Sequence, residues 1–486
     1  MAIRVEDLRE TLEQYGQEHV LRFWDNLTAE ERGVLQESVA TVDFPLMARL
    51  IDEWIHNEPS AEHFSCIDPV DVIPEPDMSH GDTVEAFETG EVRLAEGRVG
   101  VIMVAGGQGT RLGFDGPKGA YPVGSITGKS LFQYHAEKIL NLERRYRCIL
   151  PWYIMVSGAN EAATREFFEA NQYFGLGREN VYFFQQDMVP CVDEHGRFML
   201  EEPCRLAKSP NGHGGCIPAL AERGVIADCH ARGIDTLTYF QVDNWAVQVA
   251  DPVFIGYHVR QGSEMSSKVR RKTELREPVG VHCLCDGQYR LIEYSELDFY
   301  PQLLEVDARG NPVHFAGNPA MHVFSVPFIE RVYANYQQFP WHRAHKKIPH
   351  VDSAGNYVRP DGPNGYKFET FIFDALQFVE RAPVNLELRA MGEYTPIKQF
   401  EGAGSVLEAR DHMRRHWGAW LVEAGAPVPK DAEGYPPFDV EISPAYALSK
   451  EEFVLKSHGR HWPAINGPIA IGAGGEISWA EANASA

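Results

Sequence analysis

The stretch V101-I-M-V-A-G-G-Q-G-T-R-L-G-F-D-G-P-K118 joins an apolar run to a glycine-rich loop. The run belongs to VGVIMVA (99–105), and its unbroken apolar character is typical of a parallel strand that is buried on both faces. Because glycine lacks a Cβ atom, an anion can approach the backbone amides of the loop closely. Arg111 and Lys118 supply two cations in the same loop. The stretch therefore predicts a strand followed by a binding site for an anion.

The alternation of strand, loop and helix that begins here continues along the chain. Ser130 is predicted to cap a helix that carries Leu131, His135, Ile139 and Leu142 on one side. Further strands are predicted at 152–156, 181–186, 236–242, 279–284 and 289–294, and the segment 322–332 leads into another helix. This order predicts an α/β fold with an open, mostly parallel sheet, whose ligands lie beyond the carboxyl ends of the strands.

The length of 486 residues exceeds what one core supports, and two or three domains are expected. Residues 1–95 have helical spacing, as in Val5, Leu8, Leu12 and in the segment 44–55, and they are predicted to form a helical N-terminal domain. Residues 96–400 are the predicted catalytic domain. Residues 401–486 are rich in proline and glycine after a helix at 408–417, and they predict a small C-terminal domain of low helical content.

The charge and cysteine content limit the function classes. The net charge is −24, from 69 acidic and 45 basic residues, which argues against a nucleic-acid or membrane-surface binder. No segment reads as a signal peptide or a membrane span. Eight scattered cysteines without a CxxC pair argue against zinc and predict reduced thiols in the cytoplasm. The sequence gives no indication of the oligomeric state.

Two common nucleotide motifs are excluded for the glycine loop. The segment G124-S-I-T-G-K-S130 has three residues, not four, between its first glycine and the Gly-Lys-Ser triplet of a Walker loop. The dinucleotide fingerprint fails because Leu112 stands where its third glycine is needed, and the second strand ends at Ser157 rather than at an acid. A nicotinamide dehydrogenase is therefore disfavoured.

The loop instead resembles the signature of the sugar-nucleotide pyrophosphorylases, in which Gly-Gly-x-Gly-Thr-Arg-Leu is followed by Pro-Lys. Seven segments between about 95 and 400 follow the order of this family, and they are most similar to the eukaryotic-type UDP-N-acetylhexosamine pyrophosphorylases. The resemblance implies a Rossmann-like, GT-A-like nucleotidyltransferase fold. It also implies an Mg²⁺-dependent transfer of the uridylyl group from UTP to a sugar 1-phosphate.

The resemblance assigns residues to the nucleotide. It places Ala105, Gly106 and Gly107 against the nucleotide, with Arg111 and Lys118 over the triphosphate. The segments VYFFQQDMVP (181–190) and SPNGHGG (209–215) place Gln186 at the uracil edge and Gly212 beside it. The family's remaining phosphate lysines correspond to Lys367 in YKFETFIFDAL (366–376) and Lys398 in EYTPIKQ (393–399).

The resemblance also assigns residues to the metal and the sugar. Asp243, at the end of YFQVD (239–243), is the expected ligand of Mg²⁺, and His213, Glu293, Tyr294 and Asn318 are the expected sugar contacts. One departure bears on the choice of sugar. N-acetylhexosamine enzymes usually have Gly-Asn-Gly-Gly where this chain has G212-H-G-G215, and Gly-His-Gly is more familiar from UDP-glucose and broad-range UDP-sugar pyrophosphorylases. N-acetylglucosamine 1-phosphate is the expected substrate, and glucose 1-phosphate is the alternative.

Two further readings compete with these assignments. The segment PWHRAHKKIPH (340–350) invites a metal site, but no cysteine or carboxylate completes it, and zinc is not expected there. A catalytically silent sensor on the same fold is the rival from another class. Such a sensor would be expected to lose Arg111, Lys118 or Asp243, and the chain keeps all three.

Overall fold

The computed structural model describes residues 5–57, 62–389 and 392–479, and its contacts divide the chain into two compact units. The first unit comprises residues 1–64, 186–219 and 335–375, and we call it the insert unit. The second unit comprises residues 65–185, 220–334 and 376–486, and we call it the sheet unit. This division differs from the three consecutive domains predicted at 1–95, 96–400 and 401–486.

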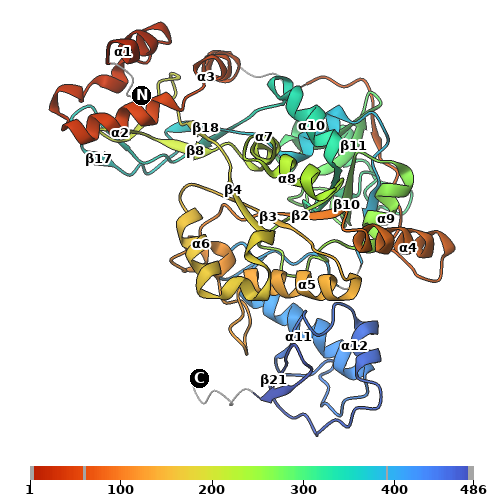
Figure 1. The fold of residues 1–486 in the computed structure, drawn as a ribbon. Helices are drawn as coiled ribbons and strands as arrows, with labels where there is room; N and C mark the ends of the chain where they lie inside the picture. Colours follow the sequence, from red (N-terminus) through yellow and green to blue (C-terminus); the bar gives the residue numbers. More distant parts are fainter. Residues whose placement is uncertain (1–4, 58–61, 390–391, 480–486) are drawn as a thin grey trace. The chain divides into compact units, whose positions relative to one another are not determined.

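One large sheet lies at the centre of the sheet unit (Figure 1). In the described part of the chain it has eleven strands, in the order β1-β11-β13-β10-β14-β9-β2-β3-β4, with β12 paired to β11 and β19 paired to β10. The bounds are β1 Ile67–Pro69, β2 Val99–Val104, β3 Trp152–Val156, β4 Val181–Gln185, β9 Thr236–Gln241, β10 Met265–Arg271, β11 Val281–Cys285, β12 Gln288–Ile292, β13 Ala316–Gly317, β14 His322–Ser325 and β19 Asn385–Glu387.

The sheet is mixed, which corrects the prediction of a mostly parallel one. Strands β9, β2, β3 and β4 are parallel neighbours, as expected, but β14 pairs antiparallel with β9 and β10, and β11 pairs antiparallel with β1, β12 and β13. The β11–β12 hairpin shows the physical reason. Its connection is the dipeptide Asp286-Gly287, and both residues have positive φ angles, of 49° and 80°. Such a two-residue turn joins antiparallel strands.

Helices cover both faces of the parallel strands (Figure 1). Trp152 and Ile154 of β3 pack into the core shared with α5, whereas the hydroxyl of Tyr153 donates to Asp228 of α8 at 2.7 Å. The α5 helix begins after Ser130, whose side chain accepts from the Gln133 amide, so the predicted cap is confirmed. The bounds are α4 Gly81–Ala95, α5 Leu131–Tyr146, α6 Glu161–Ala170, α8 Val225–Arg232, α9 Pro252–Gln261 and α10 Val326–Ala334, and α7 is Cys216–Glu222.

Residues 65–95 belong to the sheet unit because α4 packs closely on α9. A Cβ atom added to Gly256 would lie 1.7 Å from the Ala86 carbonyl oxygen, and one added to Gly90 would lie 1.9 Å from that of Pro252. The two helix backbones are therefore in direct contact, which only glycine at both positions permits. The predicted N-terminal domain of 1–95 thus extends about thirty residues too far.

The C-terminal residues also belong to the sheet unit. The α11 helix (Val406–Glu423) packs on α5 through Trp417, whose ring centroid lies 5.9 Å from that of Tyr134. Glu137 and Asn141 of α5 bond to Ser443 and to the Pro444 carbonyl. Around this core lie α12 (Lys450–Lys456) and a small sheet of β20 (Val440–Ile442), β21 (Ile469–Ile471) and β22 (Ile477–Trp479). One continuous core thus replaces the predicted separate domain at 401–486.

The insert unit combines the N-terminal helices with two later segments. Its helices are α1 Val5–Gln14, α2 Ala29–Ala40 and α3 Phe44–Ile51, and its strands are β5 Met188–Pro190, β6 Leu200–Glu202, β7 Arg205–Leu206, β8 Lys208–Pro210, β15 His342–Lys346, β16 His350–Val351, β17 Tyr357–Val358 and β18 Gly365–Glu369. Leu8, Leu50, Phe198 and Phe368 share one buried core. The helices predicted from Val5 and from Phe44 are confirmed.

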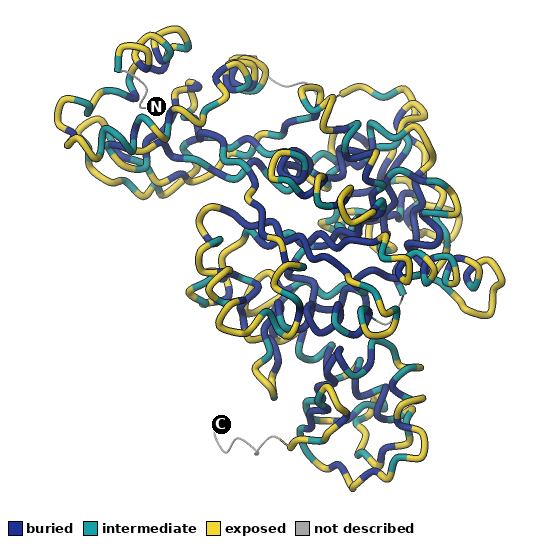
Figure 2. The backbone as a smooth tube through the Cα atoms, in the orientation of Figure 1, coloured by how far each residue is buried: buried dark blue, intermediate teal, exposed yellow. Residues whose placement is uncertain are grey.

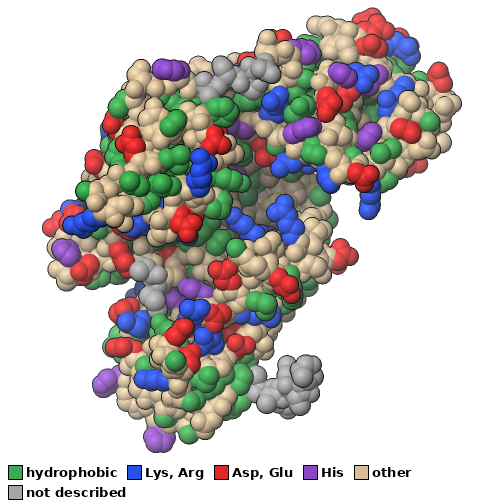
Figure 3. All heavy atoms as spheres, turned by 180° about the vertical axis from the view of Figure 1, so that it is seen from behind, with side chains coloured by type: hydrophobic (Ala, Val, Ile, Leu, Met, Phe, Trp, Pro, Cys, Tyr) green, Lys and Arg blue, Asp and Glu red, His purple; other side chains and the backbone are tan. Residues whose placement is uncertain are grey.

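Burial follows the elements in both units. Figure 2 shows the strands of the large sheet as mostly buried and the loops as mostly exposed. Acidic and basic side chains are intermixed on the face drawn in Figure 3. None of the described helices is long and apolar enough to cross a membrane.

Candidate active site

The loop after β2 holds its carbonyl groups against the protein. Asn160 donates from Nδ2 to the carbonyls of Ala105 at 2.8 Å and Gly107 at 3.2 Å, and Ser157 Oγ donates to that of Gly106 at 2.8 Å. The amides of Gly106 and Gly107 donate no hydrogen bond to any described residue, and a Cβ atom on Gly107 would meet only open space. The loop therefore presents backbone donors to a ligand, as an anion site requires.

The two cations of the loop have different surroundings. Lys118 donates its backbone amide to the Gly107 carbonyl at 3.1 Å, and its Nζ lies 2.8 Å from Oδ2 of Asp243. The side chains of this pair are 16% and 13% exposed, so the pair is largely shielded from water. Arg111 is exposed and forms no ion pair with a described residue. Its guanidinium is available to an anion that binds the loop.

Asp243 follows β9, the strand that lies next to β2 in parallel. Its carbonyl accepts from the Ile397 amide at 2.9 Å. Asn244 makes two side-chain bonds to the same segment, from Nδ2 to the Glu393 carbonyl at 2.7 Å and at Oδ1 from the Thr395 amide at 2.9 Å. The segment that carries Lys398 is thereby tied to the strand end that carries Asp243, and the Lys398 side chain is exposed.

The chain on either side of Asp243 is supported from α5 by two residues that were not predicted to belong to the site. His135 Nε2 bonds to the Val242 carbonyl at 3.1 Å, and Lys138 Nζ donates to the carbonyls of Trp245 and Val247. Burial lowers the pKa of Lys138 to about 7 and that of His135 to about 3. The available signal was a lysine and a histidine on the apolar side of a predicted helix.

Two of the predicted sugar contacts meet at Gly280 in the sheet unit. The Asn318 amide donates to the Gly280 carbonyl at 2.9 Å, and Asn318 Oδ1 accepts from the Ala320 amide at 2.9 Å. A Cβ atom on Gly280 would lie 2.8 Å from Glu293 Oε1, so the carboxyl group of Glu293 lies directly over this glycine. Tyr294 follows Glu293 and is half exposed.

The insert unit holds the predicted uracil contacts. Gln186 Nε2 donates to the Gly212 carbonyl at 3.4 Å. Gly212 has a φ angle of +81°, and a Cβ atom there would lie 2.3 Å from the Thr370 carbonyl oxygen. Thr370 in turn donates from Oγ1 to the Asn211 carbonyl at 2.9 Å. The position therefore requires glycine for its backbone conformation and for space.

His213 is held as a neutral imidazole. Its Nδ1 accepts from the Ile372 amide at 3.1 Å, and its ring stacks on Phe371 with centroids 5.3 Å apart. Burial, with a smaller contribution from the charge of His342, lowers the pKa of His213 to about 4. Because Nδ1 accepts, Nε2 carries the hydrogen and can donate. Lys367 lies in β18, three residues before Thr370, and is half-buried.

The histidines of 340–350 have structural contacts. His342 Nε2 lies 2.8 Å from Asp374 Oδ2 and its ring stacks on Phe371, while His345 stacks on Tyr366. Within residues 5–57, 62–389 and 392–479, no three side chains among His, Cys, Asp and Glu form a group that could hold a metal ion.

The buried histidines of the sheet unit make its stability depend on pH. Burial lowers the pKa of His135 to about 3 and those of His258 and His282 to about 4. The unfolded chain binds protons at these residues below about pH 6.5, whereas the folded unit does not until about pH 4. Stability should therefore fall by about 2 kcal/mol per histidine between pH 7 and pH 5.

Urea unfolding at pH 7 and at pH 5 measures this effect. His135→Gln should reduce the loss of stability between the two pH values, whereas replacement of the exposed His461 by glutamine should leave it unchanged. An unfolding free energy that is the same at both pH values would show that these histidines do not stay neutral.

The loop of free amides, Arg111, and the Lys118–Asp243 pair lie beyond the ends of the parallel strands β2 and β9, as expected for a nucleotidyltransferase. The model of the UTP–glucose-1-phosphate uridylyltransferase family matches residues 48–399, and the chain belongs to this family. The family resemblance predicted from the sequence is thus confirmed, and the protein is a uridylyltransferase.

Individual relatives resemble the chain over most of its length. It is 36% identical over 472 residues to UDP-N-acetylhexosamine pyrophosphorylase-like protein 1 of Xenopus tropicalis, covering 90% of this chain and 91% of that protein. It is 33% identical over 444 residues to the UDP-N-acetylglucosamine pyrophosphorylase of Saccharomyces cerevisiae, covering 86% and 92%. The crystal structure of the Trypanosoma brucei UDP-N-acetylglucosamine pyrophosphorylase in complex with inhibitor superposes with a TM-score of 0.80 at 25% identity, covering 96% and 98%.

Proposed function

We propose that the chain joins UTP and N-acetylglucosamine 1-phosphate to give UDP-N-acetylglucosamine and pyrophosphate. The observation that carries the proposal is the loop after β2, which contains two backbone amides without a described partner together with Arg111 and Lys118. The names of the relatives in Xenopus tropicalis and Saccharomyces cerevisiae support the choice of an N-acetylhexosamine substrate. We further propose that β9, β2, β3 and β4 with their helices form a Rossmann-like, GT-A-like core.

The chemistry follows from the charges. An oxygen of the sugar phosphate attacks the α-phosphorus of UTP in line, the bond from that phosphorus to the bridging oxygen breaks, and pyrophosphate leaves. A phosphate monoester is already an anion near neutral pH, so no general base is needed. Arg111 and Lys118 would neutralise the charge that develops on the triphosphate, and Lys367 and Lys398 would bind further phosphate oxygens. Catalysis is then positioning and charge neutralisation.

The remaining residues would select the substrates. Gln186 and Gly212 would bind the uracil base, and Ala105, Gly106 and Gly107 the nucleotide backbone. Glu293, Tyr294, Asn318 and His213 would contact the sugar. Glu293 and Asn318 both contact Gly280, which supports the proposal that these two residues bind the same substrate.

Asp243 fits the single carboxylate that an Mg²⁺ site of this kind needs. Mg²⁺ takes one or two protein carboxylates and fills its other positions with water and substrate phosphates. The Asp243 carboxylate lies 2.8 Å from Lys118 Nζ. Among the described residues, no group of three possible metal ligands surrounds it. When bound, Mg²⁺ would supply positive charge to the phosphates.

We also propose that the protein acts in the cytoplasm. All eight cysteines are outside disulfides, including Cys283 and Cys285, whose sulfur atoms lie 3.6 Å apart on one strand as a thiol–thiol hydrogen bond. Free thiols in such numbers are typical of a reducing compartment.

Release of pyrophosphate from UTP, measured with each sugar separately, tests the proposed function. N-acetylglucosamine 1-phosphate should give the highest kcat/KM, compared with N-acetylgalactosamine 1-phosphate and glucose 1-phosphate. TTP and ATP in place of UTP test the choice of base. Pyrophosphate release with glucose 1-phosphate alone would favour the second candidate, a UTP–glucose-1-phosphate uridylyltransferase, which the histidine at position 213 supports.

The substitution His213→Asn tests the residue on which the two candidates differ. It gives the Gly-Asn-Gly-Gly pattern and replaces a ring whose remaining nitrogen, Nε2, can only donate by an amide that both donates and accepts. The ratio of kcat/KM for N-acetylglucosamine 1-phosphate to that for glucose 1-phosphate should rise about tenfold, a typical effect of one contact in a substrate pocket. An unchanged ratio, with thermal unfolding as for the wild type, would remove His213 from sugar selection.

A further inference from the structure

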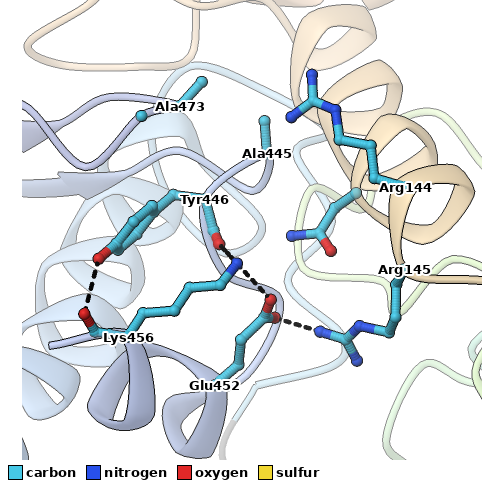
Figure 4. Close-up of a pocket in the computed structure, with 9 residues that line it drawn as sticks. Arg144, Arg145, Ala445, Tyr446, Glu452, Lys456 and Ala473 are labelled. Carbon is cyan, nitrogen blue, oxygen red and sulfur yellow. Dashed lines mark hydrogen bonds and ion pairs between the residues drawn. The ribbon is translucent and has the colours of Figure 1, made fainter. Parts of the chain in front are cut away.

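The C-terminal part of the sheet unit carries a hollow that the uridylyl transfer does not use. It has a volume of about 480 Å³ and lies between the last turns of α5, the α12 helix and the turn that joins β21 to β22 (Figure 4). Its lining includes Arg144, Arg145, Tyr446, Glu452 and Lys456. This volume lies in the range of small-molecule sites.

The charges in the hollow do not balance. Glu452 is the one carboxylate among the described lining residues, and this group is already shared, because it accepts from Lys456 Nζ at 2.8 Å, from Arg145 and from the Leu448 amide at 2.8 Å. Arg144 forms no ion pair with a described residue. The described lining thus has three cations and one acid, and the Glu476 carboxylate beside it accepts from the Gly474 amide at 2.9 Å, so the lining residues carry a net positive charge in a chain whose net charge is −24.

The walls of the hollow are fixed by packing. The Tyr446 ring lies against Gly475, where a Cβ atom would come within 2.8 Å of it, and meets Phe453 edge-on with centroids 6.0 Å apart. Lys456 Nζ lies 5.4 Å from the centre of the Tyr446 ring. Figure 4 shows Arg144 and the Lys456–Glu452 pair on different sides of the space. A ligand would therefore meet Arg144 on one side and Lys456 with the neighbouring Tyr446 ring on the other.

We propose that this hollow binds a small molecule that carries a phosphate group. Arginine suits this role because its planar guanidinium matches phosphate oxygens in pairs, and lysine adds a second point charge. The aromatic ring and the volume leave room for an organic group attached to the phosphate. The site is separate from the loop after β2, because none of its lining residues belongs to that loop.

Isothermal titration of the full-length protein with pyrophosphate at low salt tests the proposal. The wild type should bind two pyrophosphate ions per chain, one at the loop after β2 and one in the hollow. Arg144→Glu should weaken pyrophosphate binding in the hollow by about tenfold or more. The rate of pyrophosphate release from UTP should stay at the wild-type value. The matched control is Arg309→Glu, which reverses the charge of another exposed arginine and should leave pyrophosphate binding at both sites unchanged.

The other variants separate the two sites and the two kinds of ligand. Lys118→Ala should weaken the loop site and leave the hollow, so a failure of the proposed function does not hide the new site. Titration with UMP in place of pyrophosphate distinguishes an organic from an inorganic phosphate ligand. The proposal is supported if the wild type binds either ligand and Arg144→Glu abolishes that binding. The proposal is wrong if the wild type binds pyrophosphate at one site only, Arg144→Glu leaves that site intact, and Arg144→Glu does not abolish any binding of UMP.

Discussion

Replacement of Lys118 by alanine should lower kcat by a factor of about 10² to 10⁴ while the protein stays folded. The lysine lies 2.8 Å from Asp243 at the end of the glycine loop, where it would neutralise phosphate charge as the bond to pyrophosphate breaks. Its side chain is only 16% exposed, so water replaces that charge poorly. Steady-state pyrophosphate release and thermal unfolding measure the two parts of this prediction.

Lys129 offers a matched control for Lys118. It forms an ion pair with Glu137 at 2.8 Å, with side chains 15% and 10% exposed, so it resembles the Lys118–Asp243 pair in distance and burial. Lys129→Ala should therefore lower the free energy of unfolding about as much as Lys118→Ala does, but it should change kcat little. A Lys118→Ala variant that retains a rate close to that of the wild type would remove this lysine from the mechanism.

Replacement of Asp243 by asparagine should lower kcat by a factor of about 10² to 10³ and raise the Mg²⁺ concentration needed for half-maximal rate. Asparagine has the same shape, so the backbone bond from Ile397 to residue 243 stays possible. What is lost is the negative charge that would hold Mg²⁺. Rates measured over a range of Mg²⁺ concentrations separate the metal effect from a loss of fold.

Glu137→Gln is the corresponding control, because it neutralises the acid of the matched pair. It should leave the Mg²⁺ dependence unchanged. If Asp243→Asn changes kcat without changing the Mg²⁺ dependence, the carboxylate acts through Lys118 and not on the metal.

The glycine loop and its surroundings could be predicted because their signals are local. A buried strand, a run of glycines and a serine cap lie within about thirty residues, and each has a direct physical meaning. The strand β2 and the cap at Ser130 both follow that prediction. The ion pair of Lys118 with Asp243 at 2.8 Å joins two residues from separate predicted segments, and the sequence could not give this distance.

The division of the chain could not be predicted because it depends on contacts between distant residues. Phe44 packs on Phe198 with ring centroids 6.0 Å apart, and Gln17 donates to the Gly196 carbonyl at 3.1 Å. Apolar patterns show that such side chains are buried but not which partner they meet. The antiparallel half of the sheet was missed for a related reason, although the Asp286-Gly287 turn was a local signal for one hairpin.

The supporting residues of the site were missed because they act on backbone groups. Asn244 bonds to main-chain atoms of Glu393 and Thr395, and Lys138 bonds to carbonyls after Asp243. A carbonyl is present at every position, so sequence patterns do not mark it as a partner. Such contacts become visible only when the structure brings the segments together.

The most direct test of the account is a crystal structure of the protein soaked with UTP and Mg²⁺. The triphosphate should lie on the amides of Gly106 and Gly107, with the side chains of Arg111 and Lys118 within hydrogen-bonding distance of its oxygens. A loop without nucleotide, or a bound triphosphate from which both cations point away, would contradict it.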